Sequence, residues 1–324
     1  MRAVMCEEYG EPDVLVVRER PDPVPGPGQV RVAMKAASLN FPDGLLVANR
    51  YQDTAPLPFV LGQEGAGLVD ALGEGVSGLS VGDRVIVNGV RGTCAQYLLA
   101  TPAQLFRFDA SVPFADAASI SVIYGTTIHA LRTRGDLKPG ETLLVLGAGG
   151  GVGSAAVQMG KLLGATVIAA ASSAEKLVVA QACGADHLID YSKDDLRDRL
   201  REIVGKDGVD VVYDPVCGPL AEPAFRSLGW NGRFLVIGFA AGITALPLNL
   251  PLLKGASVVG VFWGASIQRE PENYRRDMDD LVRWMAQGKL RPHIGGRYSM
   301  DQAAQALTEM MSGNAKGKLV IEID

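Results

Sequence analysis

The sequence predicts an α/β protein with two domains, a β-rich domain followed by a doubly wound parallel sheet. The chain has 324 residues, which is enough for two hydrophobic cores. Its first part holds short apolar runs between glycine, proline and aspartate, whereas helix and strand patterns alternate from about Ser111 onward. Such alternation is typical of a parallel sheet that carries helices on both faces.

The first part is predicted to form closely spaced strands. Residues 29–35 alternate polar and apolar side chains with a period of two, after a turn rich in proline and glycine at 23–28. Further short apolar runs cover 67–72, 84–87 and 95–100. This spacing of strands and turns indicates a small, barrel-like β domain.

The second part opens with a strand over 142–146, a glycine-rich turn and a helix that Gly164 ends. Further strands are predicted over 166–170, 187–190, 209–213, 233–237 and 257–261, and further helices over 175–183, 196–204 and 221–228. Near the end of the chain, Ser299 and Gln302 fit a capping box before one last helix. A strand over 319–323 could return to the first domain.

Composition and charge exclude several classes of protein. A content of 48% hydrophobic and 21% charged residues is ordinary for a globular chain, and the formal net charge of -5 argues against a nucleic-acid surface. No apolar run approaches the roughly 20 residues that a membrane span needs. Glu7 and Glu8 stand where a signal peptide would be apolar, and the four cysteines lie far apart. These features predict a cytoplasmic protein with reduced thiols.

The turn over 147–153 is the clearest candidate binding site. A strand that leads through glycines into a helix presents backbone N–H groups and the positive helix end to an anion, typically a pyrophosphate. The pattern G-x-G-x-x-G does not fit from Gly147, and the frame that fits is Ala148-x-Gly150-x-x-Gly153. With several strand–helix units after it, the turn predicts dinucleotide binding, while a tight turn that binds nothing is the alternative.

The residues after the next strand indicate which dinucleotide. An NAD enzyme usually places an acid there for the ribose 2′-hydroxyl, but this chain has Ser172 and Ser173, with Lys176 just beyond. Two hydroxyls and an ammonium suit a 2′-phosphate, which predicts NADPH. Two alternatives stay open: Ser172 and Glu175 form a capping box by themselves, and Glu175 could serve as the ribose acid of an NAD enzyme.

A wider set of motifs carries a family resemblance. They are 37–43 (ASLNFPD), 58–67 (PFVLGQEGAG), 81–85 (VGDRV), 124–126 (YGT), the glycine turn, 184–186 (GAD) and the closing pair Gly317-Lys318. With these motifs the chain resembles, along essentially its whole length, the quinone oxidoreductase branch of the medium-chain dehydrogenase/reductase superfamily, which includes zeta-crystallin-like proteins. The resemblance implies a GroES-like catalytic domain over 1–118, completed by 291–324, and a Rossmann NADPH-binding domain over 119–290.

The resemblance also implies roles for particular residues around a cleft that would hold nicotinamide and substrate. Asn40 and Tyr51 would line the substrate side, Thr126 and the segment Gly238 to Gly242 would contact nicotinamide, and Phe262 and Trp263 would edge the cleft. The pyrophosphate would meet Gly150, Gly151, Val152 and Gly153, and the 2′-phosphorylated adenosine would meet Ser172, Ser173, Lys176 and Tyr191.

Simpler interpretations remain: Asn40 as a turn residue, Tyr51 as a loop anchor, Tyr191 as a cover for the sheet end, Trp263 as packing and Asp43 as a local cap.

The zinc ligands of the related alcohol dehydrogenases are absent from this chain. Asn40 stands where those enzymes have cysteine and Gln63 where they have histidine, so no metal is predicted. Without a Lewis acid, a quinone or an α,β-unsaturated carbonyl is the expected hydride acceptor, because it is already electrophilic. Tyr51 or Asn40 is the candidate hydrogen-bond donor to the developing enolate.

Other functions remain open beside this one. A 2-enoyl thioester (acyl-CoA) reductase would need a basic patch, to which Arg50, Arg269, Arg275 and Arg276 could contribute. A low-turnover NADPH-binding sensor or structural protein is the alternative from another class, and zinc alcohol dehydrogenase activity is the least favoured. The family resemblance further implies a homodimer in which sheets extend through their edge strands.

Overall fold

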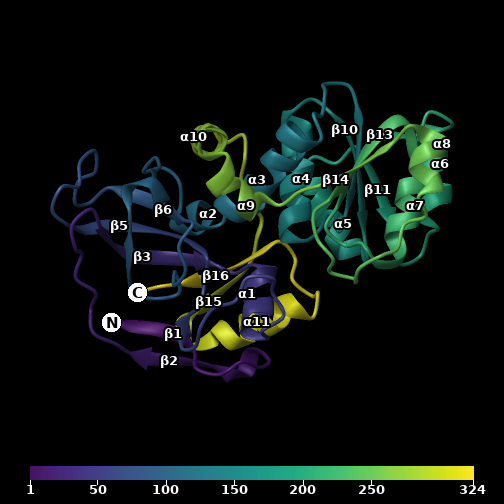
Figure 1. Ribbon diagram of the computed structural model, residues 1–324. Helices are drawn as coiled ribbons and strands as arrows, with labels where there is room; N and C mark the ends of the chain where they lie inside the picture. Colours follow the sequence, from purple (N-terminus) through teal and green to yellow (C-terminus); the bar gives the residue numbers. More distant parts are fainter. The chain divides into compact units, whose positions relative to one another are not determined.

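A computed structural model describes residues 1–324, and the chain forms two compact units (Figure 1). The first unit comprises Met1–Val122 and Met278–Asp324, and the second comprises Ile123–Asp277. The predicted α/β fold class is confirmed: the first unit is rich in β-strands, and the second holds a parallel sheet with helices. None of the helices combines the length and the apolar character that crossing a bilayer requires.

The first unit is built on two sheets. One has the order β2-β1-β4, from β1 (Arg2–Cys6), β2 (Leu15–Glu19) and β4 (Phe59–Val60). The other has the order β15-β16-β3-β5-β6-β8, with β7 also paired to β3, from β3 (Val30–Ser38), β5 (Glu64–Leu72), β6 (Arg84–Asn88), β7 (Tyr97–Ala100), β8 (Leu105–Arg107), β15 (Ile294–Ser299) and β16 (Lys318–Glu322). The predicted period of two is confirmed in β3, which buries Val30, Val32 and Met34.

Short helices complete the first unit. They are α1 (Phe41–Val47), α2 (Phe114–Ala118) and α11 (Ala303–Met311), with 3₁₀ turns η1 (Pro12–Val14), η2 (Pro102–Gln104) and η5 (Met300–Gln302). The predicted capping box at the end of the chain is confirmed, because the Ser299 backbone N–H donates to Gln302 Oε1 at 3.0 Å. It opens η5, and α11 follows directly.

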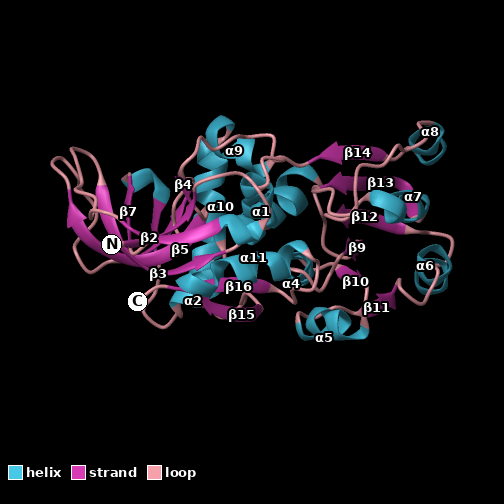
Figure 2. Ribbon diagram, turned by 90° about the horizontal axis from the view of Figure 1, so that it is seen from below, coloured by secondary structure: helices cyan, strands magenta, loops and turns pink.

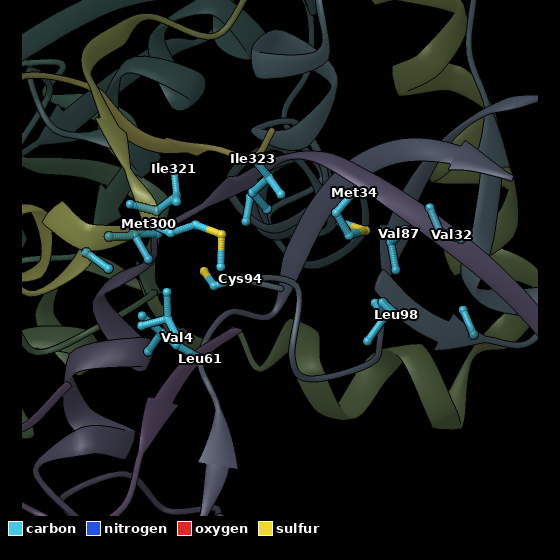
Figure 3. Packing of buried hydrophobic residues seen from close by; sticks show 14 of the residues in the cluster. Val4, Val32, Met34, Leu61, Val87, Cys94, Leu98, Met300, Ile321 and Ile323 are labelled. Atoms are coloured by element: carbon cyan, nitrogen blue, oxygen red, sulfur yellow. The ribbon is translucent and has the colours of Figure 1, made fainter. Parts of the chain in front are cut away.

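The core of the first unit joins the two ends of the chain (Figure 3). Ile321 of β16 and Met300 of η5 belong to the same buried cluster as Val4 of β1 and Leu61. In addition, β16 pairs antiparallel with β3, with Val320 opposite Ser38. The predicted return of the terminal strand to the first domain is therefore confirmed.

The second unit contains one parallel sheet of six strands with the order β11-β10-β9-β12-β13-β14. Its strands are β9 (Thr142–Leu146), β10 (Thr166–Ala171), β11 (His187–Asp190), β12 (Val209–Asp214), β13 (Leu228–Val236) and β14 (Ser257–Gly260). In Figure 2 these strands stand in one row, with β14 and β11 at its two ends and α6 and α7 across the row from α4. The predicted doubly wound sheet is confirmed.

The helices of the second unit follow the strands in alternation. They are α4 (Gly151–Leu162), α5 (Ala174–Ala182), α6 (Leu196–Val204), α7 (Ala221–Arg226), α8 (Asn249–Lys254) and α9 (Trp263–Arg269), with the 3₁₀ turn η4 (Gly218–Leu220). Before β9 come α3 (Ser121–Ile128), whose first two residues belong to the first unit, and a π-helical turn, η3 (His129–Arg134). After α9 the helix α10 (Pro271–Ala286) leads back into the first unit.

Two local predictions in this unit were wrong. The helix predicted over 221–228 ends at Arg226, because Leu228 already pairs with Val209 as the first residue of β13. The capping box of Ser172 with Glu175 does not form: the N-cap of α5 is Ser173, whose hydroxyl accepts from the Lys176 backbone N–H. The strand β10 continues through Ala171, so the helix begins one residue later than that box requires.

Candidate cofactor and active site

The glycine turn lies between β9 and α4, where the sequence placed it. An added Cβ at Gly153 would lie 2.1 Å from the Gly147 carbonyl oxygen, so only glycine allows the turn to close on the helix. At Gly150 the nearest atom to an added Cβ is 3.5 Å away, which leaves this face of the turn open. Gly153 is therefore needed for α4 to pack against the turn, whereas Gly150 leaves room for an approaching group.

The first turn of α4 offers hydrogen-bond donors. Gly150 is its N-cap and supplies no capping side chain. The backbone N–H groups of Gly151, Val152 and Gly153 donate to no other backbone group, as expected for the start of a helix. Three N–H groups and the positive end of a twelve-residue helix thus converge beside the open face of Gly150. The arrangement suits a pyrophosphate.

The polar residues after β10 lie close together. The Lys176 ammonium donates to Ser172 Oγ at 3.2 Å. Burial raises the pKa of Tyr191, although a hydrogen bond from the Ser172 hydroxyl opposes this rise. Ser173 instead caps α5, and the Glu175 side chain is exposed on that helix. The structure therefore brings together Ser172, Lys176 and Tyr191, which offer two hydroxyls and an ammonium to a phosphate.

The glycine turn and the Lys176 cluster touch each other. An added Cβ at Gly149 would lie 2.4 Å from Lys176 Cβ and 2.6 Å from its carbonyl oxygen. Glycine at 149 is what lets the start of α5 approach the turn so closely. The two candidate anion sites are consequently neighbours, as the two ends of one ADP-like moiety would require.

The residues expected near nicotinamide come from other elements of the same unit. The Trp263 indole lies so close to α3 that an added Cβ at Gly125, next to Thr126, would be 2.4 Å from its Cζ2. Trp263 also makes an edge-to-face contact with Tyr274, with ring centroids 6.2 Å apart. Gly238 lies against the loop after β12, and Phe262 is 55% exposed. Among these candidates, the contact that the structure shows is between Trp263 and Gly125, the residue before Thr126.

In the first unit, three strand ends bring a lysine, an amide and a carboxylate together. Ser38 pairs with Glu64 across β3 and β5, and β16 lies on the other side of β3. The Lys318 ammonium donates to the Leu39 carbonyl oxygen at 2.7 Å, Asn40 Oδ1 at 2.7 Å and Glu64 Oε1 at 3.0 Å. The side chains of Lys318 and Glu64 are 3% and 0% exposed, so this ion pair is buried.

The remaining atoms of this cluster are also paired. Asn40 Nδ2 donates to Glu64 Oε1 at 2.9 Å and to the Ser38 carbonyl oxygen at 3.3 Å. Glu64 Oε2 accepts from Ser121 Oγ at 2.7 Å and from the Val122 backbone N–H at 2.8 Å. Both amide hydrogens of Asn40 are therefore used within the protein.

Asp43 lies beside the cluster on α1. Its carboxylate accepts from the Asn40 backbone N–H at 2.7 Å and from Gln63 Nε2 at 3.3 Å, so it acts as a local cap for α1. Burial raises the pKa of Asp43 from 3.8 to about 6, and the nearby Lys318 charge limits that rise. An aspartate that changes charge near neutral pH thus stands next to the candidate site.

Tyr51 follows α1 and is only partly buried. Its hydroxyl has no hydrogen-bond partner among the described residues, and burial, Asp53 and Asp43 together raise its pKa. A protonated, unpaired hydroxyl is a suitable donor to a developing negative charge.

Sequence reasoning did not place Lys318, Glu64 or Ser121 in the site. Glu64 and Lys318 stand in two of the quoted motifs, but 254 positions separate them. A lysine directly before the apolar run 319–321 of β16 was the one available signal, because buried lysines are rarely found without a partner.

The chain is similar to known proteins along nearly its whole length. A family model described as a zinc-binding dehydrogenase matches residues 151–286, and one described as an alcohol dehydrogenase GroES-like domain matches residues 26–110. A quinone oxidoreductase-like protein 2 homolog from Nematostella vectensis is 36% identical, over 99% of this chain and 88% of that protein. A quinone oxidoreductase from Pseudomonas aeruginosa is 34% identical over 99% of both chains.

The fold is shared with solved structures. The crystal structure of Escherichia coli quinone oxidoreductase complexed with NADPH superimposes with a TM-score of 0.92, at 28% identity and over 100% of both chains.

Proposed function

Because the chain belongs to the quinone oxidoreductase branch of the medium-chain dehydrogenase/reductase superfamily, we propose that it is an NADPH-dependent, zinc-independent reductase of quinones or α,β-unsaturated carbonyls. The observation that carries the proposal is the pairing of two anion sites, the free amides of α4 and the Lys176 cluster, across Gly149. The cofactor and the acceptor are supported by separate features.

NADPH is supported by the chemistry of the two anion sites. The amides of Gly151, Val152 and Gly153 would hold the pyrophosphate, and Ser172, Lys176 and Tyr191 would surround the 2′-phosphate. An NADPH complex is also known for the Escherichia coli relative. When bound, NADPH supplies a hydride at its nicotinamide ring.

The chain's own part in the reduction would be to orient the acceptor and stabilise its negative charge. The sequence offered Tyr51 and Asn40 as donors, and the structure favours Tyr51, because the Tyr51 hydroxyl is unpaired while both Asn40 amide hydrogens are used. We therefore assign Tyr51 the hydrogen bond to the developing enolate or quinol oxygen. Asn40 would line the side of the site on which the acceptor binds. Thr126, Gly238, Phe262 and Trp263 would contact the nicotinamide end.

Zinc independence is supported by the donor set of the first unit. The positions of the related zinc ligands hold the neutral amides of Asn40 and Gln63, and no group of three His, Cys, Asp or Glu side chains is placed to hold a metal. The Lys318 ammonium is bonded to both Asn40 and Glu64, so a positive charge already stands there. These residues do not fit a divalent cation.

A homodimer is supported by β14, one of the two edge strands of the second unit's sheet. The strand β14 pairs only with β13, so its other edge has no partner strand. The large apolar side chains exposed on β14, on α8 and on the adjoining segments are Trp230, Ile243, Leu248, Leu252, Leu253 and Val258. A second copy related by a two-fold axis would pair the two β14 edges and cover this apolar patch.

The decisive experiment measures NADPH oxidation by the purified protein against quinones, enones and enoyl thioesters, with and without a metal chelator. We expect turnover with quinones or enones that the chelator leaves unchanged. Turnover with thioesters alone would favour an enoyl-thioester reductase. Tight NADPH binding without any acceptor-dependent oxidation would favour a sensor, and loss of activity on chelation would refute zinc independence.

A further inference from the structure

We propose that Lys318 is a positioning residue of the reductase, which fixes Asn40 and Glu64 and through them the start of α1, the helix that Tyr51 follows, and the first turn of α3. This inference rests on the proposed function for its kinetic consequences, but its structural part stands on the buried cluster alone. Lys318 approaches the cluster from β16, beside the ends of β3 and β5.

The ammonium has no spare hydrogen-bonding capacity. It carries three hydrogens, and the structure provides three acceptors, on Leu39, Asn40 and Glu64. Since Oδ1 of Asn40 accepts from Lys318 while Nδ2 donates to Glu64, only one of the two amide orientations satisfies both neighbours. Lys318 and Glu64 together therefore select the rotamer of Asn40.

The backbone ensures that Lys318 arrives at this place. Gly317 has φ +83°, and an added Cβ there would lie 2.3 Å from the His293 carbonyl oxygen. The Lys318 backbone N–H donates to that same oxygen at 2.8 Å. Glycine at 317 thus allows the tight entry into β16 that directs the lysine to Asn40.

A purely structural role does not account for a charge at this position. The next three residues of β16, Leu319, Val320 and Ile321, are fully buried, so an apolar residue at 318 would extend the same core. Burying an ion pair costs desolvation, and well-packed apolar residues often stabilise a fold as well or better. The pair is better explained by what it holds in place.

Two elements depend on the cluster. Asn40 stands immediately before α1, and Tyr51 follows the end of that helix. Glu64 accepts from Ser121 and from the Val122 backbone N–H, which anchors the first turn of α3. One ammonium–carboxylate pair therefore sets the starting points of both elements.

The test uses the paired substitution Glu64→Gln with Lys318→Met, because removing either charge alone leaves the other buried without a partner. We expect the double variant to remain folded and to bind NADPH within about twofold of the unmodified protein, while kcat falls by about tenfold to a hundredfold, as for a misplaced catalytic group. The matched control is Arg297→Met with Glu322→Gln, an exposed ion pair that joins β15 to β16, the strand of Lys318. Unchanged kcat in a folded double variant would overturn the positioning role while leaving the proposed function intact.

A second measurement needs neither a variant nor an acceptor. In the unmodified protein, both side-chain amide hydrogens of Asn40 are hydrogen-bonded and buried, whereas Asn49 is exposed. We therefore expect the Asn40 amide hydrogens to exchange with solvent at least about tenfold more slowly than those of Asn49. Equal exchange rates, measured by NMR, would overturn the inference even if the protein proved to reduce no quinone.

Discussion

Lys176 illustrates how much of the proposed cofactor preference rests on one side chain. It is the only cation of the Ser172 and Tyr191 cluster, and a 2′-phosphate is the one group that distinguishes NADPH from NADH. We expect Lys176→Ala to raise the dissociation constant for NADPH at least tenfold, about 1.4 kcal/mol, with little change for NADH. Fluorescence titration with both cofactors measures this, with the exposed Lys206→Ala as control. Equal losses for both cofactors would refute the phosphate role.

Tyr51 is the residue on which the proposed chemistry depends. Tyr51→Phe removes only the hydroxyl, so we expect kcat to fall by about a hundredfold, while the affinity for NADPH changes little. Tyr97→Phe is the control, because that ring stacks with Arg31 and its hydroxyl makes no bond within the protein. Steady-state kinetics with the best quinone decides the matter, and unchanged kinetics would remove Tyr51 from the mechanism.

Asp43 predicts a pH dependence of stability. Its pKa is about 6 in the folded protein and 3.8 when unfolded, so the folded state holds the proton more tightly. The free energy of unfolding should therefore fall as pH rises from about 4 to about 6, by roughly 3 kcal/mol from this group. In the Asp43→Asn variant, this pH dependence of the free energy of unfolding should be absent. Urea unfolding of both proteins at pH 4 and pH 7 tests this, and parallel pH profiles would contradict it.

At the scale of elements, the turn between β9 and α4 separates two uses of glycine. Gly153→Ala places a methyl group against the Gly147 carbonyl oxygen, so we expect it to lower the melting temperature. Gly150→Ala meets open space in the protein, so stability should be kept, but the methyl would face the pyrophosphate and weaken NADPH binding by about tenfold. Thermal unfolding and NADPH titration of both variants check this contrast. The reverse pattern would mean that the dinucleotide binds elsewhere.

Elements with a strong local pattern could be predicted from the sequence. The bounds of β9, β11 and α6 match those expected, since apolar periodicity and flanking glycine or aspartate define them locally. The helix α10 went unpredicted although Met278, Leu281 and Met285 are buried at helical spacing. The Lys318 cluster could not be foreseen, because its members come together only through the pairing of β16, β3 and β5.

At the scale of the whole molecule, the free β14 edge predicts the state of assembly. Leu252→Glu with Leu253→Glu places two charges in the apolar patch, so we expect it to convert a dimer into monomers. Val81→Glu, at another exposed apolar residue in the first unit, is the control and should remain dimeric. Sedimentation at micromolar concentration measures both. A monomeric unmodified protein would contradict the proposed homodimer.

The contact between Gly149 and Lys176 limits how such a protein could change its coenzyme during evolution. Any side chain at 149 would press on the lysine's own main chain and shift the start of α5. Replacement of Lys176 by an acid, by contrast, requires no change at Gly149. Descendants that come to prefer the unphosphorylated coenzyme should therefore differ at 176 first and retain glycine at 149.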